Sequence, residues 1–180
     1  AETNTGKIGT LYKIAMDADK LNADKTKPVS SQIAKIDTLT RADLETYLGT
    51  AHRFSSSFWG DGVALDEKDS EYYLYNIGQS GIGLSRDYFF DTDEKSIEIR
   101  KKYQEFISKQ MENFGLPVDV EKLYALEERM AKSFYPKEKL RDPHANYHKM
   151  SINEIKEKFT GFDWDKYLTA RGIANVEYIN

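Results

Sequence analysis

The apolar residues near the start of the chain recur at spacings of three and four, which is the period of an amphipathic helix. This pattern predicts a helix over Thr5–Asn22 with one apolar face, made of Ile8, Leu11, Tyr12, Ala15, Ala18 and Leu21. A second helix is predicted to begin at Thr40, because Thr40 and Asp43 have the spacing of a weak capping box. Its buried stripe is predicted to be Leu44, Tyr47, Leu48 and Ala51.

Two longer helices are predicted in the middle of the chain. Asp93 begins the first, and Gly115 followed by Pro117 ends it, because glycine favours the helix C-terminus and proline cannot continue the helix. Asp119 begins the second, and Pro136 closes it. The residues predicted to face inward are Ile99, Tyr103, Phe106, Ile107, Met111 and Phe114 in the first helix, and Val120, Leu123, Leu126, Met130 and Phe134 in the second.

The clearest local signal is the capping box that Ser151 and Glu154 form at the start of another helix, with Met150 and Ile155 as its hydrophobic staple. Gly161 is predicted to end this helix. A further short helix is predicted over Asp163–Arg171, before Gly172. The tail, Ile173–Asn180, alternates only weakly and carries no stop signal, so the native chain is predicted to continue past Asn180.

The segment Asp61–Ile77 follows a strand pattern instead. Two short apolar runs, Val63-Ala64-Leu65 and Tyr72–Ile77, flank the turn-forming residues Asp66–Asp69, which predicts a small β-hairpin. Gly78, Gly81 and Gly83 are then predicted to break regular structure and form a loop. The predicted fold class is therefore mostly α: a multi-helix lobe with one small β-hairpin near residues 61–77, in a single domain over residues 1–180.

The composition narrows the possible functions. The 180 residues are 39% hydrophobic and 31% charged, which is typical of one folded domain. The net charge of −4, without a basic run, argues against a nucleic-acid partner. The chain has no cysteine, so it forms no disulfide and no thiolate metal site. Because no apolar run approaches the roughly 20 residues that span a bilayer, no transmembrane segment is predicted.

Several blocks of sequence then point to a family. The most specific are Asp66–Ser70, Gln79–Leu84 and Arg86–Phe89. Other blocks, in the same order along nearly the whole chain, are Leu11–Asp17, Lys27–Val29, Tyr47–Gly49 with His52-Arg53, Leu126–Glu128, Arg141–Pro143, and Asp163-Trp164. In this order they resemble the neprilysin and endothelin-converting enzyme family of zinc metalloendopeptidases. The absence of cysteine is similar to its bacterial, peptidase O-like branch.

The resemblance implies that this chain is a fragment of the N-terminal helical lobe, which closes over the catalytic lobe of the same polypeptide and encloses peptide substrates. It implies zinc in the parent enzyme, in a His-Glu-x-x-His helix that this chain lacks. No catalytic or metal-binding residue is therefore predicted here, and the isolated chain is predicted to be inactive and free of zinc. The family also implies an exported, periplasmic or cell-envelope location, although the chain carries no targeting signal.

Two motifs suggest a metal-binding or a phosphate-binding site within this chain. His144 and His148 would share a helix face and could begin a zinc site, but Pro143 precedes them and no glutamate intervenes. A structural connector is the favoured interpretation. Gly78–Gly83 matches neither a dinucleotide-binding nor a Walker pattern, which favours a tight structural loop.

Several charged residues, some of them beside aromatic ones, could have either a structural or a functional role. Arg86 is interpreted mainly as a structural residue whose guanidinium group ties loops together. The alternative is that Arg86 and Tyr88 line the substrate chamber. Glu127 and Glu128 are interpreted as solvated partners of nearby basic residues, and His52 as the cap of a helix end.

Two hypotheses of different classes remain open. The first is the enzyme fragment just described. The second is a non-catalytic helical module that binds a protein or a glycan and derives from such a lobe, with its high aromatic content of 13% on an exposed surface. A His-Glu-x-x-His motif encoded beyond Asn180 would favour the first hypothesis, and a stop codon directly after Asn180 would favour the second.

Overall fold

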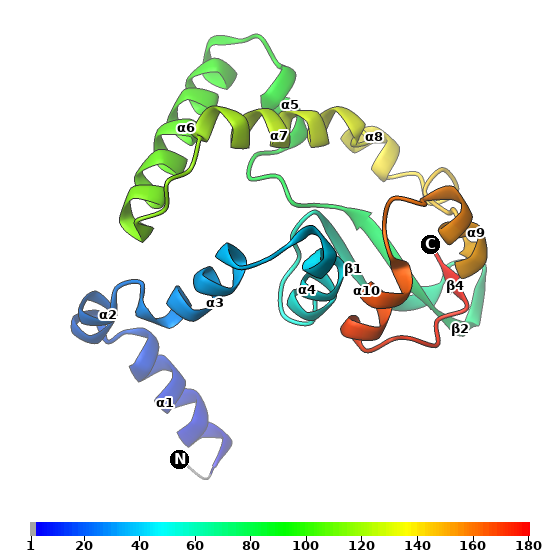
Figure 1. Cartoon of the computed structure of the whole chain (residues 1–180), viewed down its shortest axis with the longest axis horizontal. Coiled ribbons are helices and arrows are strands. Elements are labelled where there is room, and N and C mark those ends of the chain that lie inside the picture. The colour runs from blue at the N-terminus through cyan, green and yellow to red at the C-terminus, as the bar shows by residue number, and fades with distance from the viewer. Residues whose placement is uncertain (1–2) are drawn as a thin grey trace. The chain divides into compact units, whose positions relative to one another are not determined.

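Helices form most of the computed structural model, which describes residues 3–180, and a small sheet accompanies them (Figure 1). The predicted mostly α fold class is confirmed. The chain divides into two units, Ala1–Leu39 and Thr40–Asn180. The single-domain organisation stays a prediction. Among the described residues, no helix is long and apolar enough to cross a membrane.

The first unit consists of helices α1 (Asn4–Ala15), α2 (Ala18–Asp24) and α3 (Lys27–Asp37). The single helix predicted over Thr5–Asn22 is therefore wrong, because the chain breaks at Met16 and Asp17. The Asp17 carboxylate accepts a hydrogen bond from the Lys20 amide at 3.0 Å, and so caps a new helix where a continuous one was expected.

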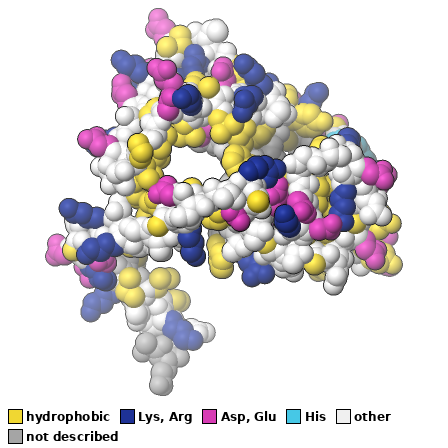
Figure 2. All heavy atoms as spheres, viewed as in Figure 1, with side chains coloured by type: hydrophobic (Ala, Val, Ile, Leu, Met, Phe, Trp, Pro, Cys, Tyr) yellow, Lys and Arg dark blue, Asp and Glu magenta, His cyan; other side chains and the backbone are white. Residues whose placement is uncertain are grey.

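The apolar face of the first unit is exposed. Ile8, Leu11 and Tyr12 each expose more than half of their surface, and Figure 2 shows hydrophobic side chains along α1. Helix α3 was not predicted, although Pro28 in its first turn and the spacing of Val29, Ile33 and Ile36 are typical of a helix.

The second unit contains the predicted hairpin, with longer strands than expected. Strand β1 (Trp59–Asp66) pairs antiparallel with β2 (Asp69–Gln79), and Asp66 faces Asp69 across the turn. Gly78 lies within β2, opposite Gly60, so the prediction that it breaks regular structure is wrong. Two further strands, β3 (Met150–Ser151) and β4 (Tyr178–Ile179), complete a sheet in the order β1-β2-β4-β3.

The core of the second unit lies where α4 (Leu44–Ala51) and α10 (Trp164–Arg171) pack together beside the sheet. A short 3₁₀ turn, η1 (Arg41–Asp43), precedes α4 and carries the predicted capping box. The two helices approach so closely that a Cβ atom on Gly49 would lie 2.3 Å from the Tyr167 carbonyl oxygen. The buried residues of this core are Leu48, Tyr75, Ile155, Tyr167, Leu168 and Ile179.

The predicted helix starts in the second unit are confirmed, as are the helix ends at Gly115 and Gly172, but the helix predicted to end at Gly161 already ends at Lys158. Four helices are each capped by the side chain of the residue before them: α6 (Glu94–Phe114) by Asp93, α7 (Val120–Ser133) by Asp119, α9 (Ile152–Lys158) by Ser151, and α10 by Asp163. The short helices α5 (Arg86–Phe90) and α8 (Lys137–Leu140) were not predicted.

The inward faces of α6 and α7 are less buried than predicted. Ile107 is buried, but Phe106 exposes 57% of its surface, so its inward placement is wrong. Phe134 lies after the last residue of α7, as its C-cap, rather than within the helix.

Candidate functional site

The most specific block of the resemblance forms the end of β2, the loop after it and α5. Gly81 turns this loop with a φ of +90°, a conformation that other residues rarely adopt. A Cβ atom at Gly81 would lie 1.7 Å from the Ser57 carbonyl oxygen, so backbone approaches backbone there. The loop prediction is confirmed for Gly81, whose position requires glycine on both counts.

This loop packs against the segment that follows α7. The Gln79 side chain donates a hydrogen bond to the Tyr135 carbonyl at 3.1 Å and accepts one from the Tyr135 amide at 2.7 Å. Between the loop and residues 134–140 lies a pocket of about 370 Å³. It is lined by Gln79, Ser80, Gly81, Ile82, Gly83, Leu84, Ser85, Arg86, Phe134, Tyr135, Lys137 and Leu140. We call it the loop pocket.

Arg86 lines the loop pocket and also ties its two walls together. Its Nε donates a hydrogen bond to the Phe134 carbonyl at 3.0 Å, and its guanidinium lies 5.1 Å from the centre of the Phe90 ring. Its nearest contact with Asp87 is 4.0 Å, whereas Lys137 approaches Asp87 to 2.8 Å. The side chain keeps 31% of its surface exposed, so part of the guanidinium faces solvent.

Tyr88 lies in α5 and does not line the loop pocket. It is half-buried, and its carbonyl accepts a hydrogen bond from Arg100 at 2.6 Å. Arg100 also donates to the Asp91 carbonyl at 2.8 Å, which fixes α5 against α6. The neighbouring Phe89 is buried and contacts the Tyr124 ring of α7. The structure therefore places Arg86, but not Tyr88, at this pocket.

Glu127 holds the loop that follows β2 through hydrogen bonds, contrary to its interpretation as a solvated residue. Both of its carboxylate oxygens accept from the Tyr103 hydroxyl, at 2.9 and 2.8 Å, and one accepts from the Gly83 amide at 3.4 Å. Burial, and then the hydrogen bond to Glu127, raise the pKa of Tyr103, so its hydroxyl stays a donor. Glu128 does approach Lys132 across one helical turn, at 4.0 Å.

His52 stands at the end of α4, as predicted, but its ring turns into the interior. Its Nδ1 lies 2.8 Å from Asp61 and 2.9 Å from the Tyr167 hydroxyl, and its Nε2 lies 2.7 Å from the Ser57 hydroxyl. His52 is therefore the C-cap residue of α4, as predicted, and its ring also joins a buried hydrogen-bond network that was not predicted. No sequence signal pairs His52 with Asp61, because the partner comes from the strand of a hairpin.

The Ser57–His52–Asp61 chain has the connectivity of a serine hydrolase triad, yet the geometry favours a structural role. The side chains of His52 and Asp61 expose 0% and 2% of their surface. Asp61 also accepts from the Tyr75 hydroxyl at 2.6 Å and from Arg171 at 2.8 Å. Burial alone would raise the pKa of Asp61, but these hydrogen bonds outweigh it and lower the pKa. The network thus ties α4, the sheet and α10 together.

The histidine pair does not form a helical metal-binding face. His144 lies in a turn and His148 in irregular chain, and both are exposed. Within residues 3–180, no group of three or more histidine, cysteine, aspartate or glutamate side chains could hold a metal ion.

Comparisons with known proteins place these features in a family. The model of peptidase family M13 matches residues 1–180. Endothelin-converting enzyme 1 of Rattus norvegicus is 25% identical over 178 residues, which cover 91% of this chain and 23% of the relative. Neutral endopeptidase of Lactobacillus helveticus is 26% identical over 173 residues, which cover 88% of this chain and 25% of the relative.

Solved structures agree with the sequence matches. The crystal structure of Mycobacterium tuberculosis zinc metalloprotease Zmp1 in complex with an inhibitor matches with a TM-score of 0.86 and 26% identity, over 98% of this chain and 28% of that one. A partial open state of the same metalloprotease matches with a TM-score of 0.74 over 99% of this chain. This chain therefore spans about a quarter of the length of the relatives that it matches.

Proposed function

The chain belongs to peptidase family M13, and from this premise we propose that it forms part of a zinc metalloendopeptidase, as the helical lobe that closes over the active site. The observation that carries the proposal is the match of nearly the whole chain, at a TM-score of 0.86, to 28% of a zinc metalloprotease. The relatives are peptidases by name, so the proposed substrates are peptides.

The zinc ligands of the parent enzyme are proposed to lie outside this chain. No step of hydrolysis is assigned to the residues of this chain. The proposed contribution of the lobe is to exclude water and large substrates on closure, and to provide walls for the bound peptide. The catalytic lobe of the same polypeptide is its proposed partner, and an exported or cell-envelope location remains a prediction from the family.

The coding sequence tests this proposal against the alternative of a non-catalytic binding module. A His-Glu-x-x-His motif encoded beyond Asn180 is the expected result. A stop codon directly after Asn180 would instead support the module, for which the exposed rings of Tyr72 and Tyr73 are the favouring observation.

We also propose that Arg86 and Tyr88 line the substrate chamber. Arg86→Gln in the complete enzyme is expected to raise KM for a peptide several-fold with little change in kcat, because the exposed part of its guanidinium would contact substrate in the ground state and the transition state alike. Tyr88→Phe is measured in the same way.

Arg53→Gln is the matched control for Arg86→Gln. The Nε of Arg53 also donates to a backbone carbonyl, that of Arg171, at 3.3 Å, but Arg53 does not line the loop pocket. Equal losses of stability in the two variants, with KM unchanged in both, would show that Arg86 only ties the loop in place.

A further inference from the structure

One edge of strand β2 is only partly paired. Strand β1 pairs with the other edge from Tyr73 to Gln79 and again at Asp69, whereas β4 pairs with β2 at Tyr75 alone. The Tyr75 carbonyl accepts a hydrogen bond from the Asn180 amide at 2.9 Å, and the Ile77 amide donates to the Asn180 carbonyl at 2.8 Å. Backbone groups alternate between the two edges of such a strand, so those of Tyr73 also point to the β4 side. Within residues 3–180, the sheet gives them no partner.

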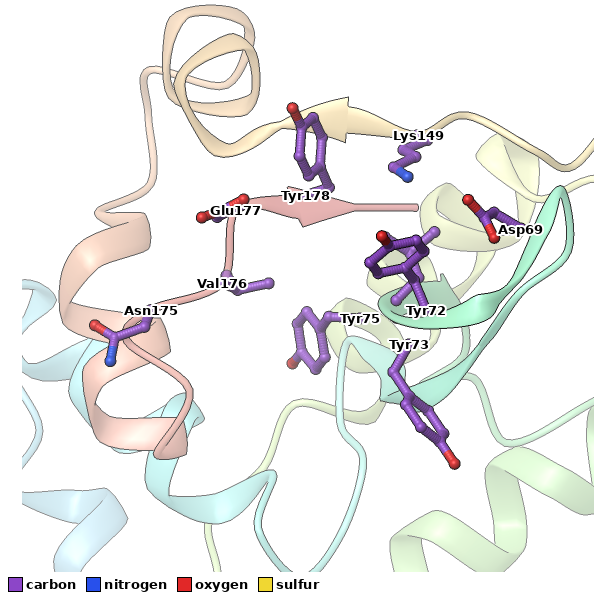
Figure 3. Close-up of a pocket in the computed structure, with 10 residues that line it drawn as sticks. Asp69, Tyr72, Tyr73, Tyr75, Lys149, Asn175, Val176, Glu177 and Tyr178 are labelled. Carbon is purple, nitrogen blue, oxygen red and sulfur yellow. The ribbon is translucent and has the colours of Figure 1, made fainter.

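The chain before β4 diverges from β2 and leaves an opening. Figure 3 shows Val176 and Glu177 on one side of this opening and Tyr72, Tyr73 and Tyr75 on the other. Two pockets meet there, of about 450 and 340 Å³, and both are lined by Tyr73, Tyr75, Asn175 and Val176. We call this opening, between Tyr73–Tyr75 and Asn175–Glu177, the β2 slot.

The two pockets share Tyr73 and Tyr75 but extend differently across the sheet, because only the larger one also reaches the face of Tyr72 and Leu74. Side chains alternate along a strand, and Val63 is paired with Tyr75, so Val63 and Tyr75 share one face while Tyr72 lies on the other. The pocket of about 340 Å³ includes Val63 and the larger one includes Tyr72. A strand inserted into the slot would therefore direct alternate side chains toward the smaller pocket and toward the Tyr72 side of the larger one.

The two pockets differ in chemistry. The smaller contains no charged side chain and is lined by apolar groups that include Val63, Ile173 and Val176. The larger has Asp69 and Glu177 on its rim, neither of which forms a salt bridge with a described residue. Among the described residues, Lys149 is the one cation that lines it, and Lys149 is held 2.7 Å from Asp66. The rim therefore has an excess of negative charge.

We propose that the β2 slot binds an extended segment of another polypeptide in which apolar and basic residues alternate. The segment would pair with the free backbone groups of Tyr73, as in strand addition to a sheet edge. Its apolar side chains would enter the smaller pocket, and its lysine or arginine side chains would meet Asp69, Glu177 and the tyrosine rings of the larger one. The proposal does not depend on the peptidase function.

The probe is a seven-residue peptide of alternating lysine and valine with blocked ends, titrated into the full 180-residue chain. Binding is followed by fluorescence anisotropy, and its location by the amide resonance of Tyr73. The expected result is saturable binding that shifts this resonance. Two further peptides carry backbone N-methyl groups, on all valines or on all lysines. One of them should lose binding, because each version blocks hydrogen bonding along one edge of the peptide.

The charge of the rim is tested with the double variant Asp69→Asn, Glu177→Gln, which should weaken binding roughly fivefold, as removal of partly exposed ion pairs does. The matched control is Asp37→Asn, Glu105→Gln, which removes two exposed carboxylates far from the slot in sequence and should leave binding unchanged.

Three outcomes would overturn the proposal: no shift of the Tyr73 resonance, equal binding of all the lysine–valine peptides, or equal affinity of the two double variants. Chitotetraose is titrated in parallel. If it shifts the Tyr73 resonance and the peptide does not, the slot is a glycan site instead.

Discussion

Asp66 shows how a single residue joins distant parts of the second unit. It lies at the start of the hairpin turn, with 2% of its surface exposed. Its carboxylate accepts from the Tyr147 hydroxyl at 2.9 Å and from the Lys149 ammonium at 2.7 Å. The Lys68 amide donates to it as well, at 3.0 Å. The hydrogen bond from Lys149, followed by that from Lys68, lowers the pKa of Asp66 from 3.8 to about 2.

The lowered pKa makes a prediction about acid stability. Folding favours the ionised form of Asp66, so its contribution to the free energy of unfolding is complete above about pH 4 and is lost as the pH falls towards 2. Asp66→Asn should therefore lower stability at neutral pH and reduce the loss of stability between pH 4 and 2, as measured by urea unfolding.

Asp69→Asn is the control for this prediction, since Asp69 faces Asp66 across the same turn but forms no salt bridge with a described residue. This variant should keep the acid dependence of the wild-type chain. If Asp66→Asn also keeps it, the pairing of Asp66 with Lys149 does not stabilise the fold.

Residue-scale contacts were also the hardest to predict. The buried position of His52 follows from a strand that places Asp61 beside it and from a helix, distant in sequence, that brings Tyr167. Neither partner is visible in the spacing of residues along the chain. Glu127 was misassigned for the same reason, because its partner Tyr103 lies on another helix.

At the scale of elements, helices α4 and α10 pack in close contact at Gly49. Gly49→Ala should lower the free energy of unfolding by about 1–3 kcal/mol, the usual cost of overpacking a core. A Cβ atom there would lie 2.3 Å from the Tyr167 carbonyl oxygen, so the helices would have to separate. This cost exceeds the gain of up to about 1 kcal/mol from the better helix propensity of alanine. Urea unfolding at neutral pH measures the difference.

Gly161→Ala is the matched control, because Gly161 lies in the same unit and a Cβ atom there would contact nothing within 4 Å. Its stability should stay close to that of the wild-type chain. A Gly49→Ala variant as stable as Gly161→Ala would contradict the close packing of α4 on α10.

Elements differed in how well the sequence predicted them, and local chemistry explains the difference. Helix starts such as Asp93 and Ser151 were predicted because the capping interaction involves residues only three positions apart. The hairpin was found because its turn separates two apolar runs. Strands β3 and β4 were missed because each has only two residues and exists through pairing with a distant segment.

At the scale of the whole molecule, the resemblance carried the identification. The ordered blocks predicted the family, and the match of the family model to residues 1–180 confirmed it. Composition and periodicity alone indicate no more than a mostly helical protein. The candidate site was predicted in part: Arg86 lies at the loop pocket, whereas the anchoring of the loop by Gln79 and Glu127 depends on helices that no local pattern connects to it.

We propose that this chain is one lobe of a zinc metalloendopeptidase and that the zinc is held elsewhere in the same protein. The most direct test measures zinc by elemental analysis, and peptide hydrolysis, for the 180-residue chain and for the complete protein purified in the same way. We predict about one zinc per molecule and hydrolysis for the complete protein, and neither for the chain alone. Stoichiometric zinc retained by the 180-residue chain, or a complete protein without zinc and activity, would contradict the claim.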